Sequence, residues 1–156
     1  MKRNLFACLL TCLLVSLPLQ ARETVPGEWK TIDDETGRAR SVVHLYVDEN
    51  GKLAGDVVKG FPEPGEPSDR VCDKCAKDDP RYQQPIIGMT IVRDMEQTAP
   101  GRWEGGKILD PIKGKEYRCE IWLEDGKLKV RGYLMMFYRT QTWEPWDAAE
   151  ATAKSD

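Results

Sequence analysis

The chain has 156 residues, enough for one domain of ordinary size, and its formal net charge is −3 at pH 7. Basic and acidic residues alternate along the sequence without a basic cluster, so we expect no nucleic-acid partner. After the first 21 residues, no apolar run approaches the roughly 18 residues that a membrane-spanning helix needs. We therefore expect no transmembrane span in the mature chain.

Residues 1–21 have the pattern of a secretory signal peptide. Lys2 and Arg3 form the basic start, residues 5–17 are apolar, and Ala21 places a small residue before the expected cleavage site. Cleavage would remove the charges of Lys2 and Arg3 and change the formal net charge from −3 to −5. The pattern predicts an exported protein, periplasmic or secreted.

Eight short runs rich in β-branched and aromatic residues follow, separated by turn signals. Asn50-Gly51 is one such signal, because both residues tolerate the positive φ that a two-residue hairpin requires. No stretch is long enough for the helix of a βαβ crossover, so the runs predict an antiparallel arrangement. The predicted strands are 27–32, 40–47, 52–58, 86–94, 103–109, 115–123, 127–133 and 139–144.

Residues 60–85 interrupt this pattern. They contain prolines at positions 62, 64, 67, 80 and 85 among charges and glycines, which predicts a long loop. A loop of this length in a compact domain is usually functional or held in place by a cross-link. Cys72 and Cys75 lie in its middle and are candidates for that cross-link.

Short strands joined by tight turns indicate an up-and-down barrel or a sandwich. Closure of eight strands would remove the exposed edges that promote aggregation. Gly27-Glu28-Trp29 opens the first strand and Arg139 opens the last, a combination similar to that of lipocalin-like barrels. There the guanidinium lies over the indole where the barrel closes. We therefore predict an all-β fold, a single eight-stranded antiparallel lipocalin-like barrel closed by Trp29 and Arg139.

Several short sequence motifs occur in the order seen in a known family. They are GEWKT (27–31), GRARSVV (37–43), GKLAG (51–55), CDKC (72–75), PIIG (85–88), GGKILDP (105–111), GKEY (114–117), LKVRGY (128–133) and RTQTW (139–143). In these motifs the chain resembles DUF2147, a family of small exported bacterial proteins. The resemblance implies a lipocalin-like barrel and supplies no agreed catalytic residues. Residues 135–138, Met-Met-Phe-Tyr, depart from the pattern, where small residues and a glycine are expected.

Cys72, Cys75 and Cys119 predict one disulfide, because exported proteins meet an oxidising compartment. Three pairings are possible, and each leaves one thiol over. Two other chemistries compete with a structural disulfide. Redox catalysis by Cys72 and Cys75 is disfavoured by the surrounding aspartates, which raise the thiol pKa. A zinc site would join the three cysteines to His44. The disulfide is the preferred interpretation, so neither a metal nor a cofactor is predicted.

His44 is the only histidine, and the sequence contains no Gly-x-Ser-x-Gly motif. A serine or cysteine hydrolase of the usual kind needs a histidine base in contact with its nucleophile. A simpler interpretation of His44 is an exposed or hydrogen-bonded residue of a strand. We therefore predict no catalytic residues, and a thiol- or metal-dependent enzyme, one that uses Cys119 or a metal, is a minor alternative.

The barrel interior is the expected binding site, since eight strands either just fill their interior with side chains or hold one small ligand. Arg131 could bind a carboxylate with both arms of its guanidinium if its face turned inward. Its alternation with Lys127 and Lys129 instead favours the exterior. The ligand-binding candidates are Tyr117, Arg131, Tyr133, Met89 and Tyr138.

The sequence thus predicts an exported lipocalin-like protein that binds a small apolar or amphipathic ligand in its barrel. The alternative is a structural or protein-interaction module of the cell envelope with a filled barrel. The predicted organisation is a signal peptide over 1–21, a DUF2147-like barrel over 22–146 and a flexible tail over 147–156.

Overall fold

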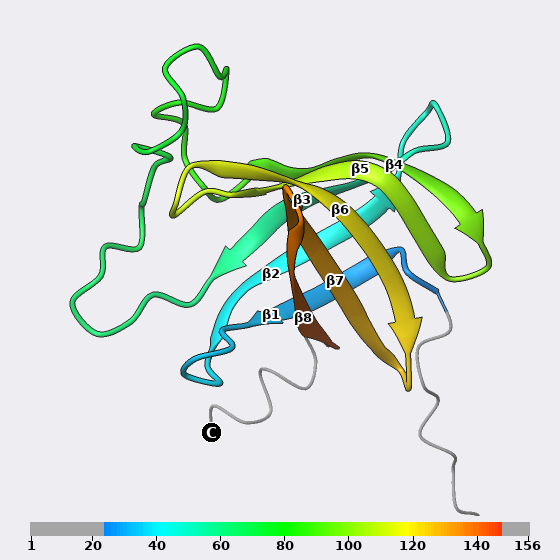
Figure 1. Ribbon diagram of the computed structural model, residues 1–156. Coiled ribbons are helices and arrows are strands. Elements are labelled where there is room, and N and C mark those ends of the chain that lie inside the picture. Colours follow the sequence, from blue (N-terminus) through cyan, green and yellow to red (C-terminus); the bar gives the residue numbers. More distant parts are fainter. Residues whose placement is uncertain (1–23, 148–156) are drawn as a thin grey trace, which may run out of the picture.

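The computed structural model describes residues 24–147 as a closed barrel of eight antiparallel strands (Figure 1). The predicted signal peptide, residues 1–21, lies outside the described residues, and so does the predicted tail apart from Asp147. The strands are β1 (Gly27–Ile32), β2 (Ala39–Val47), β3 (Leu53–Gly60), β4 (Thr90–Ala99), β5 (Arg102–Asp110), β6 (Lys115–Glu124), β7 (Lys127–Leu134) and β8 (Phe137–Pro145).

Each strand pairs with the next one along the chain, and β8 returns to pair with β1. This last pairing brings Trp29 opposite Pro145 and Lys30 opposite Glu144. Short turns suffice for such an up-and-down order, which explains the turn signals between the strands. The predicted eight-stranded antiparallel barrel is confirmed.

The strand expected at 86–94 instead runs from Thr90 to Ala99. Its first four expected residues belong to the loop, where the Ile86 amide donates to the Arg70 carbonyl at 2.9 Å. Gly88 has φ 89, a left-handed conformation that ends the extended run. Asp94, at φ 62, then breaks the alternation of β4, with the pairing to β3 shifted nearby.

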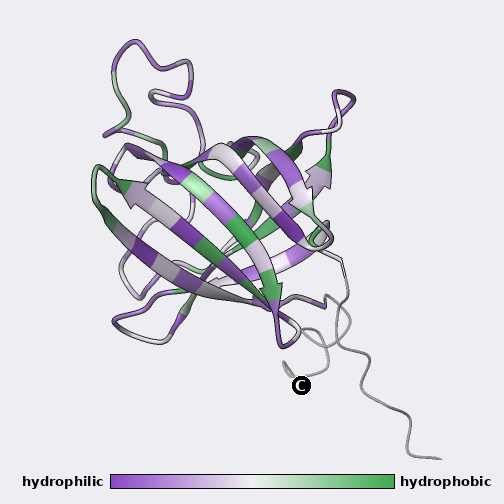
Figure 2. Ribbon diagram, turned by 45° about the vertical axis from the view of Figure 1, so that its right-hand side comes forward, coloured by the Kyte–Doolittle hydropathy of each residue, from purple (hydrophilic) through white to green (hydrophobic). Residues whose placement is uncertain are grey.

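Side chains fill one end of the barrel completely. Alternation of polar and apolar residues along the strands, visible in Figure 2, turns one side chain in two toward the interior. The indole nitrogen of Trp29 donates to the Val25 carbonyl at 2.8 Å, so the segment before β1 is held in this packed end. The largest fully buried side chains are Trp29, Trp143, Leu45, Leu53, Met95, Ile121 and Leu128.

The loop between β3 and β4 projects at the other end of the barrel, drawn green in Figure 1. A disulfide joins Cys72 to Cys75, and both residues are buried. Arg81 connects the loop to β6, with its Nη2 atom 2.8 Å from Glu116 Oε2. The loop also lies close against the β5–β6 turn, because a Cβ added at Gly114 would collide with the backbone of Lys74. We find no helix long and apolar enough to cross a bilayer within residues 24–147.

Candidate functional site

A cavity of about 550 Å³ occupies the end of the barrel opposite to the packed one. Val57, Ile91, Ile108 and Val130 contribute apolar walls, and each comes from a different strand. Trp143, almost fully buried, lies between the cavity and the packed end and forms part of its floor. The barrel therefore combines a filled end and a hollow end.

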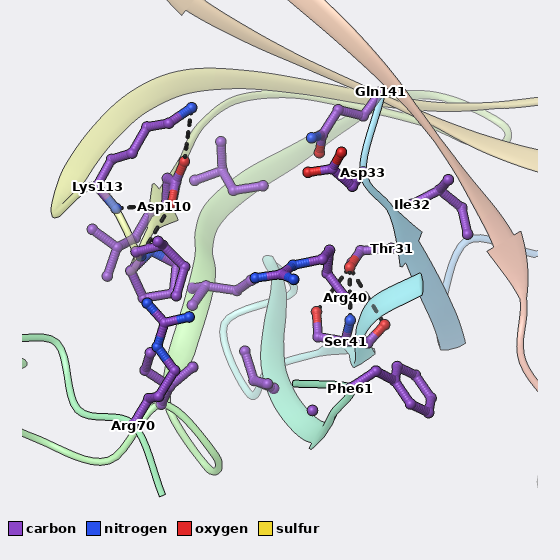
Figure 3. A pocket seen from close by; sticks show the side chains of 18 of the residues that line it. Thr31, Ile32, Asp33, Arg40, Ser41, Phe61, Arg70, Asp110, Lys113 and Gln141 are labelled. Carbon is purple, nitrogen blue, oxygen red and sulfur yellow. Dashed lines mark hydrogen bonds and ion pairs between the residues drawn. The ribbon is translucent and has the colours of Figure 1, made fainter. Parts of the chain in front are cut away.

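Polar groups gather nearer the mouth of this cavity. Thr31 Oγ1 and Ser41 Oγ are 2.9 Å apart, on neighbouring strands. Figure 3 shows them on one side of the cavity and Asp110 with Lys113 on the other, with the Arg40 side chain between the two groups. A molecule in the cavity would meet apolar side chains at the floor and hydrogen-bonding groups at the mouth.

Arg40 is held by carboxylates of the long loop. Its Nη1 atom lies 3.0 Å from Glu63 Oε1, and its Nη2 atom lies 3.3 Å from Glu66 Oε2. The Glu63 amide and the Arg40 guanidinium hold the pKa of Glu66 below its usual value, which keeps that carboxylate ionised. These pairs connect the loop to the barrel wall at the mouth.

The charges around the cavity are balanced. Four acidic and four basic residues line it, so the lining as a whole favours neither sign of ligand charge. The acidic residues are Asp33, Glu35, Glu66 and Asp110, and the basic residues are Arg40, Arg70, Lys113 and Arg139.

Tyr117 is the one of the five ligand-binding candidates that lines the cavity. Arg131 and Tyr138 lie on the outer face, where the guanidinium carbon is 4.6 Å from the centre of the Tyr138 ring. Tyr133 is on that face too, with its ring 5.9 Å from the Tyr138 ring. Met89 is buried in the core outside the lining of the cavity. The two-residue period of β7 explains the outward placement of Arg131 and Tyr133, since Leu128, Val130 and Gly132 are the inward residues of that strand.

The expected contact between Arg139 and Trp29 is not formed, although β1 and β8 do close the barrel. Trp29 lies opposite Pro145, at the far end of β8 from Arg139. Arg139 lies at the mouth instead, where its Nε atom donates to Asp34 Oδ2 at 2.7 Å. The register of the closing pair of strands thus separates the two side chains.

The predicted disulfide joins Cys72 to Cys75, and the pairings with Cys119 do not occur. Cys119 is a free thiol on the inward face of β6, and burial raises its pKa far above the usual range. His44 is exposed on the outer face of β2, with its ring 5.7 Å from that of Tyr46. The three cysteines and His44 are therefore not gathered into a four-ligand site.

Sequence reasoning missed most of the cavity wall. Gln141 and Arg139 share the inward face of β8 with Trp143, and this two-residue spacing was an available signal. Phe61 and Arg70 reach the cavity from the long loop, where no periodicity assigns a direction to a side chain.

A closed up-and-down barrel of eight antiparallel strands, packed at one end and hollow at the other, is a lipocalin-like fold. Among solved structures, the chain is similar to protein HP1028 from the human pathogen Helicobacter pylori, which belongs to the lipocalin family. The two share 17% sequence identity and a TM-score of 0.70 over 86% of this chain and 90% of the other, which shows a common fold. No curated protein matches the sequence.

The family model described as "Uncharacterized protein conserved in bacteria (DUF2147)" matches residues 27–145. The chain therefore belongs to the DUF2147 family, as its sequence motifs predicted. The match covers the strands from β1 to β8, and thus the whole barrel with the long loop.

Proposed function

We propose that this protein is an exported binding protein that holds one small apolar or amphipathic molecule in the hollow end of its barrel. The observation that carries the proposal is the cavity of about 550 Å³, open at the mouth and closed below by Trp143 and the packed core. Binding sites for small molecules are concave, mostly apolar, and about 300–1,000 Å³ in volume.

The distribution of polarity supports an amphipathic ligand. The walls formed by Val57, Ile91, Ile108 and Val130 offer only apolar contact. A head group left at the mouth would find the hydroxyls of Thr31 and Ser41. Because the lining charges balance, the proposal favours an uncharged or zwitterionic head group over a strongly charged one.

Export is the second half of the proposal. It is supported by the signal-peptide pattern of residues 1–21 and by the Cys72–Cys75 disulfide, since disulfides form in oxidising compartments. Such a protein would hold its ligand outside the cytoplasm.

A thermal unfolding experiment tests the proposal. Fatty acids, lysophospholipids and acylglycerols are added one at a time, and a binder must raise Tm, because a ligand bound only to the folded state stabilises it. At a hundredfold excess over Kd the stabilisation is about 2.7 kcal/mol, which raises the Tm of a domain of this size by several degrees. A native mass spectrum of the protein released gently from the periplasm should show an added mass that leaves on denaturation.

Gly132→Leu is the variant that tests whether the ligand binds in the cavity. A Cβ at Gly132 would meet its nearest atom, in Tyr117, at 3.4 Å, so a Cβ fits there and the rest of a leucine side chain would take up part of the cavity. Lys129→Leu puts the same side chain on the outer face of β7 as a control. We expect the first variant to lose the ligand-induced rise in Tm and the second to keep it. A bare mass, with no rise in Tm from any compound, would falsify the proposal.

A further inference from the structure

The turn between β7 and β8 presents an exposed apolar tip, formed by Leu134, Met135, Met136 and Phe137. These side chains are 50%, 87%, 87% and 74% exposed, while the other large apolar side chains on the described surface are isolated from one another along the chain. A run of four such residues is far more than the scattered apolar residues of an ordinary surface. Contiguous exposed apolar surface marks an interaction site.

Folding alone does not account for these side chains. Met135 has φ 56, a left-handed conformation that is uncommon for residues other than glycine, asparagine and aspartate. Two-residue turns between antiparallel strands favour glycine or asparagine where φ is positive. The chain instead places two large apolar side chains at the most exposed point of the turn.

Two tyrosines and two arginines lie behind the tip. Tyr133 and Tyr138 face each other across the hairpin, immediately behind Leu134 and Phe137. The guanidinium carbon of Arg118 lies 5.6 Å from the centre of the Tyr133 ring, and Arg131 lies 4.6 Å from that of Tyr138. Within residues 24–147, neither arginine forms a salt bridge with a carboxylate.

An apolar tip backed by tyrosines and arginines matches the polarity profile of a membrane interface. Apolar side chains enter the acyl region, tyrosines are enriched at the level of the head groups, and arginines reach anionic phosphates. A juxtamembrane basic residue contributes to the attraction of anionic lipids, and the attraction weakens as salt is added.

We propose that the tip formed by residues 134–137 inserts into the head-group region of a bilayer that carries anionic lipids. Gly132 and Arg139, the pair behind Tyr133 and Tyr138 along the hairpin, line the cavity, so insertion would bring the mouth of the barrel to the membrane surface. The contact is peripheral and reversible, because a few side chains provide only a small apolar area. It does not depend on whether the cavity is occupied.

Flotation with vesicles of phosphatidylethanolamine and phosphatidylglycerol tests the proposal. The double variant Met135→Gly, Met136→Asn removes the two most exposed apolar side chains and puts glycine at the position with φ 56, so it should fold at least as well as the natural chain. We expect its partition coefficient to fall at least about tenfold. Val47→Thr with Val58→Thr removes exposed apolar side chains from β2 and β3 and should leave partitioning unchanged.

The contribution of Arg118 and Arg131 is measured separately. Arg118→Gln with Arg131→Gln should weaken flotation with the anionic vesicles and remove its dependence on salt, with little change on phosphatidylcholine vesicles. The Gly132→Leu variant should still float with the vesicles, because a substitution inside the cavity leaves the side chains of the tip unchanged. Loss of ligand binding and loss of membrane binding are therefore separate results.

Two outcomes would overturn the proposal. The natural chain could fail to float with either vesicle, or the tip variant could float as well as the natural chain. A second copy of the chain could occupy the tip in place of a bilayer. Light scattering tests this alternative by measuring the molar mass in solution. A dimer that the tip variant abolishes, without any flotation, would assign the tip to self-association instead.

Discussion

Arg81 connects the long loop to the barrel through Glu116, with its Nη2 atom 2.8 Å from Glu116 Oε2 and 2.7 Å from Asp79 Oδ2. The Arg81 side chain is 17% exposed, and Glu116 also accepts from Arg93 at 2.9 Å. One guanidinium therefore joins a loop carboxylate to a strand carboxylate in a partly desolvated setting. Such charge-assisted pairs are stronger than exposed ion pairs.

Replacement of this connection should destabilise the loop. Arg81→Met leaves Asp79 without its guanidinium partner, and we expect the free energy of unfolding to fall by about 1–2 kcal/mol. Arg38→Met, at an exposed position, is the matched control and should change it by less than about 0.5 kcal/mol. Urea unfolding measures both, and hydrogen exchange should show faster exchange at residues 71–85 in the first variant. Equal effects from the two variants would contradict this assignment.

The same ion pairs should make the free energy of unfolding depend on pH in the acid range. Arg81 lowers the pKa of Asp79 to about 2. Burial alone would raise the pKa of Glu116, but hydrogen bonds from Arg81, Arg93 and Lys107 outweigh it, and the pKa is lowered. A carboxyl with a lowered folded-state pKa stabilises the fold fully above its unfolded pKa, and this contribution is lost as pH falls through the folded value.

We therefore expect the free energy of unfolding to decrease between about pH 5 and pH 2. Arg81→Met should show a shallower decrease over that range, because Asp79 then titrates nearer its unfolded value. Urea unfolding at a series of pH values measures both slopes. Parallel slopes for the two proteins would rule out a role for Arg81 in the acid response.

Gly114 should be intolerant of any side chain. Gly114 and Gly37 have φ 63 and φ 69, so both carry the cost of a left-handed backbone when replaced, about 1–2 kcal/mol. A Cβ at Gly37 meets nothing within 4 Å, whereas one at Gly114 collides with the backbone of Lys74. We expect Gly114→Ala to lower the free energy of unfolding by about 1 kcal/mol or more beyond Gly37→Ala. Thermal unfolding compares the two, and equal losses would mean that the loop moves aside freely.

Cys119 should be unreactive in the folded protein. It is 2% exposed, and burial raises its pKa, so the thiolate that alkylating agents attack is scarce at neutral pH. Iodoacetamide should label Cys119 only after denaturation, and it should label Cys72 and Cys75 only after reduction. Peptide mass spectrometry identifies each site. Labelling of Cys119 in the native protein would show that the β6 wall opens.

Most of the barrel was predictable, because strand alternation and turn chemistry are local properties of the chain. Val43 and Leu45 show the two-residue period of β2, and Asn50-Gly51 marks its turn. The start of β4 was not predictable in this way. Ile86 and Gly88 are apolar and spaced like strand residues, but their amides bind carbonyls of Arg70 and Val57 in tertiary contacts.

The candidate site was harder to predict than the fold. Of the candidates Tyr117, Arg131 and Tyr133, the first lines the cavity and the other two lie on the outer face, because alternation alone does not tell which face of a strand is inward. Arg139 was expected at Trp29, and only the register between β1 and β8 assigns it to Asp34. Contacts that depend on how two distant strands align leave no local mark in the sequence.

The seam between β1 and β8 also sets the order in which this chain can fold. Each hairpin can form as soon as its two strands exist, but Trp29 meets Pro145 only when the last strand has arrived. Closure is thus the most non-local step of the topology and a slow one. Until then β1 keeps an unpaired edge, and partly made chains are the species most prone to aggregate. Loss of β8 by truncation would therefore harm the yield of this protein more than a core substitution would.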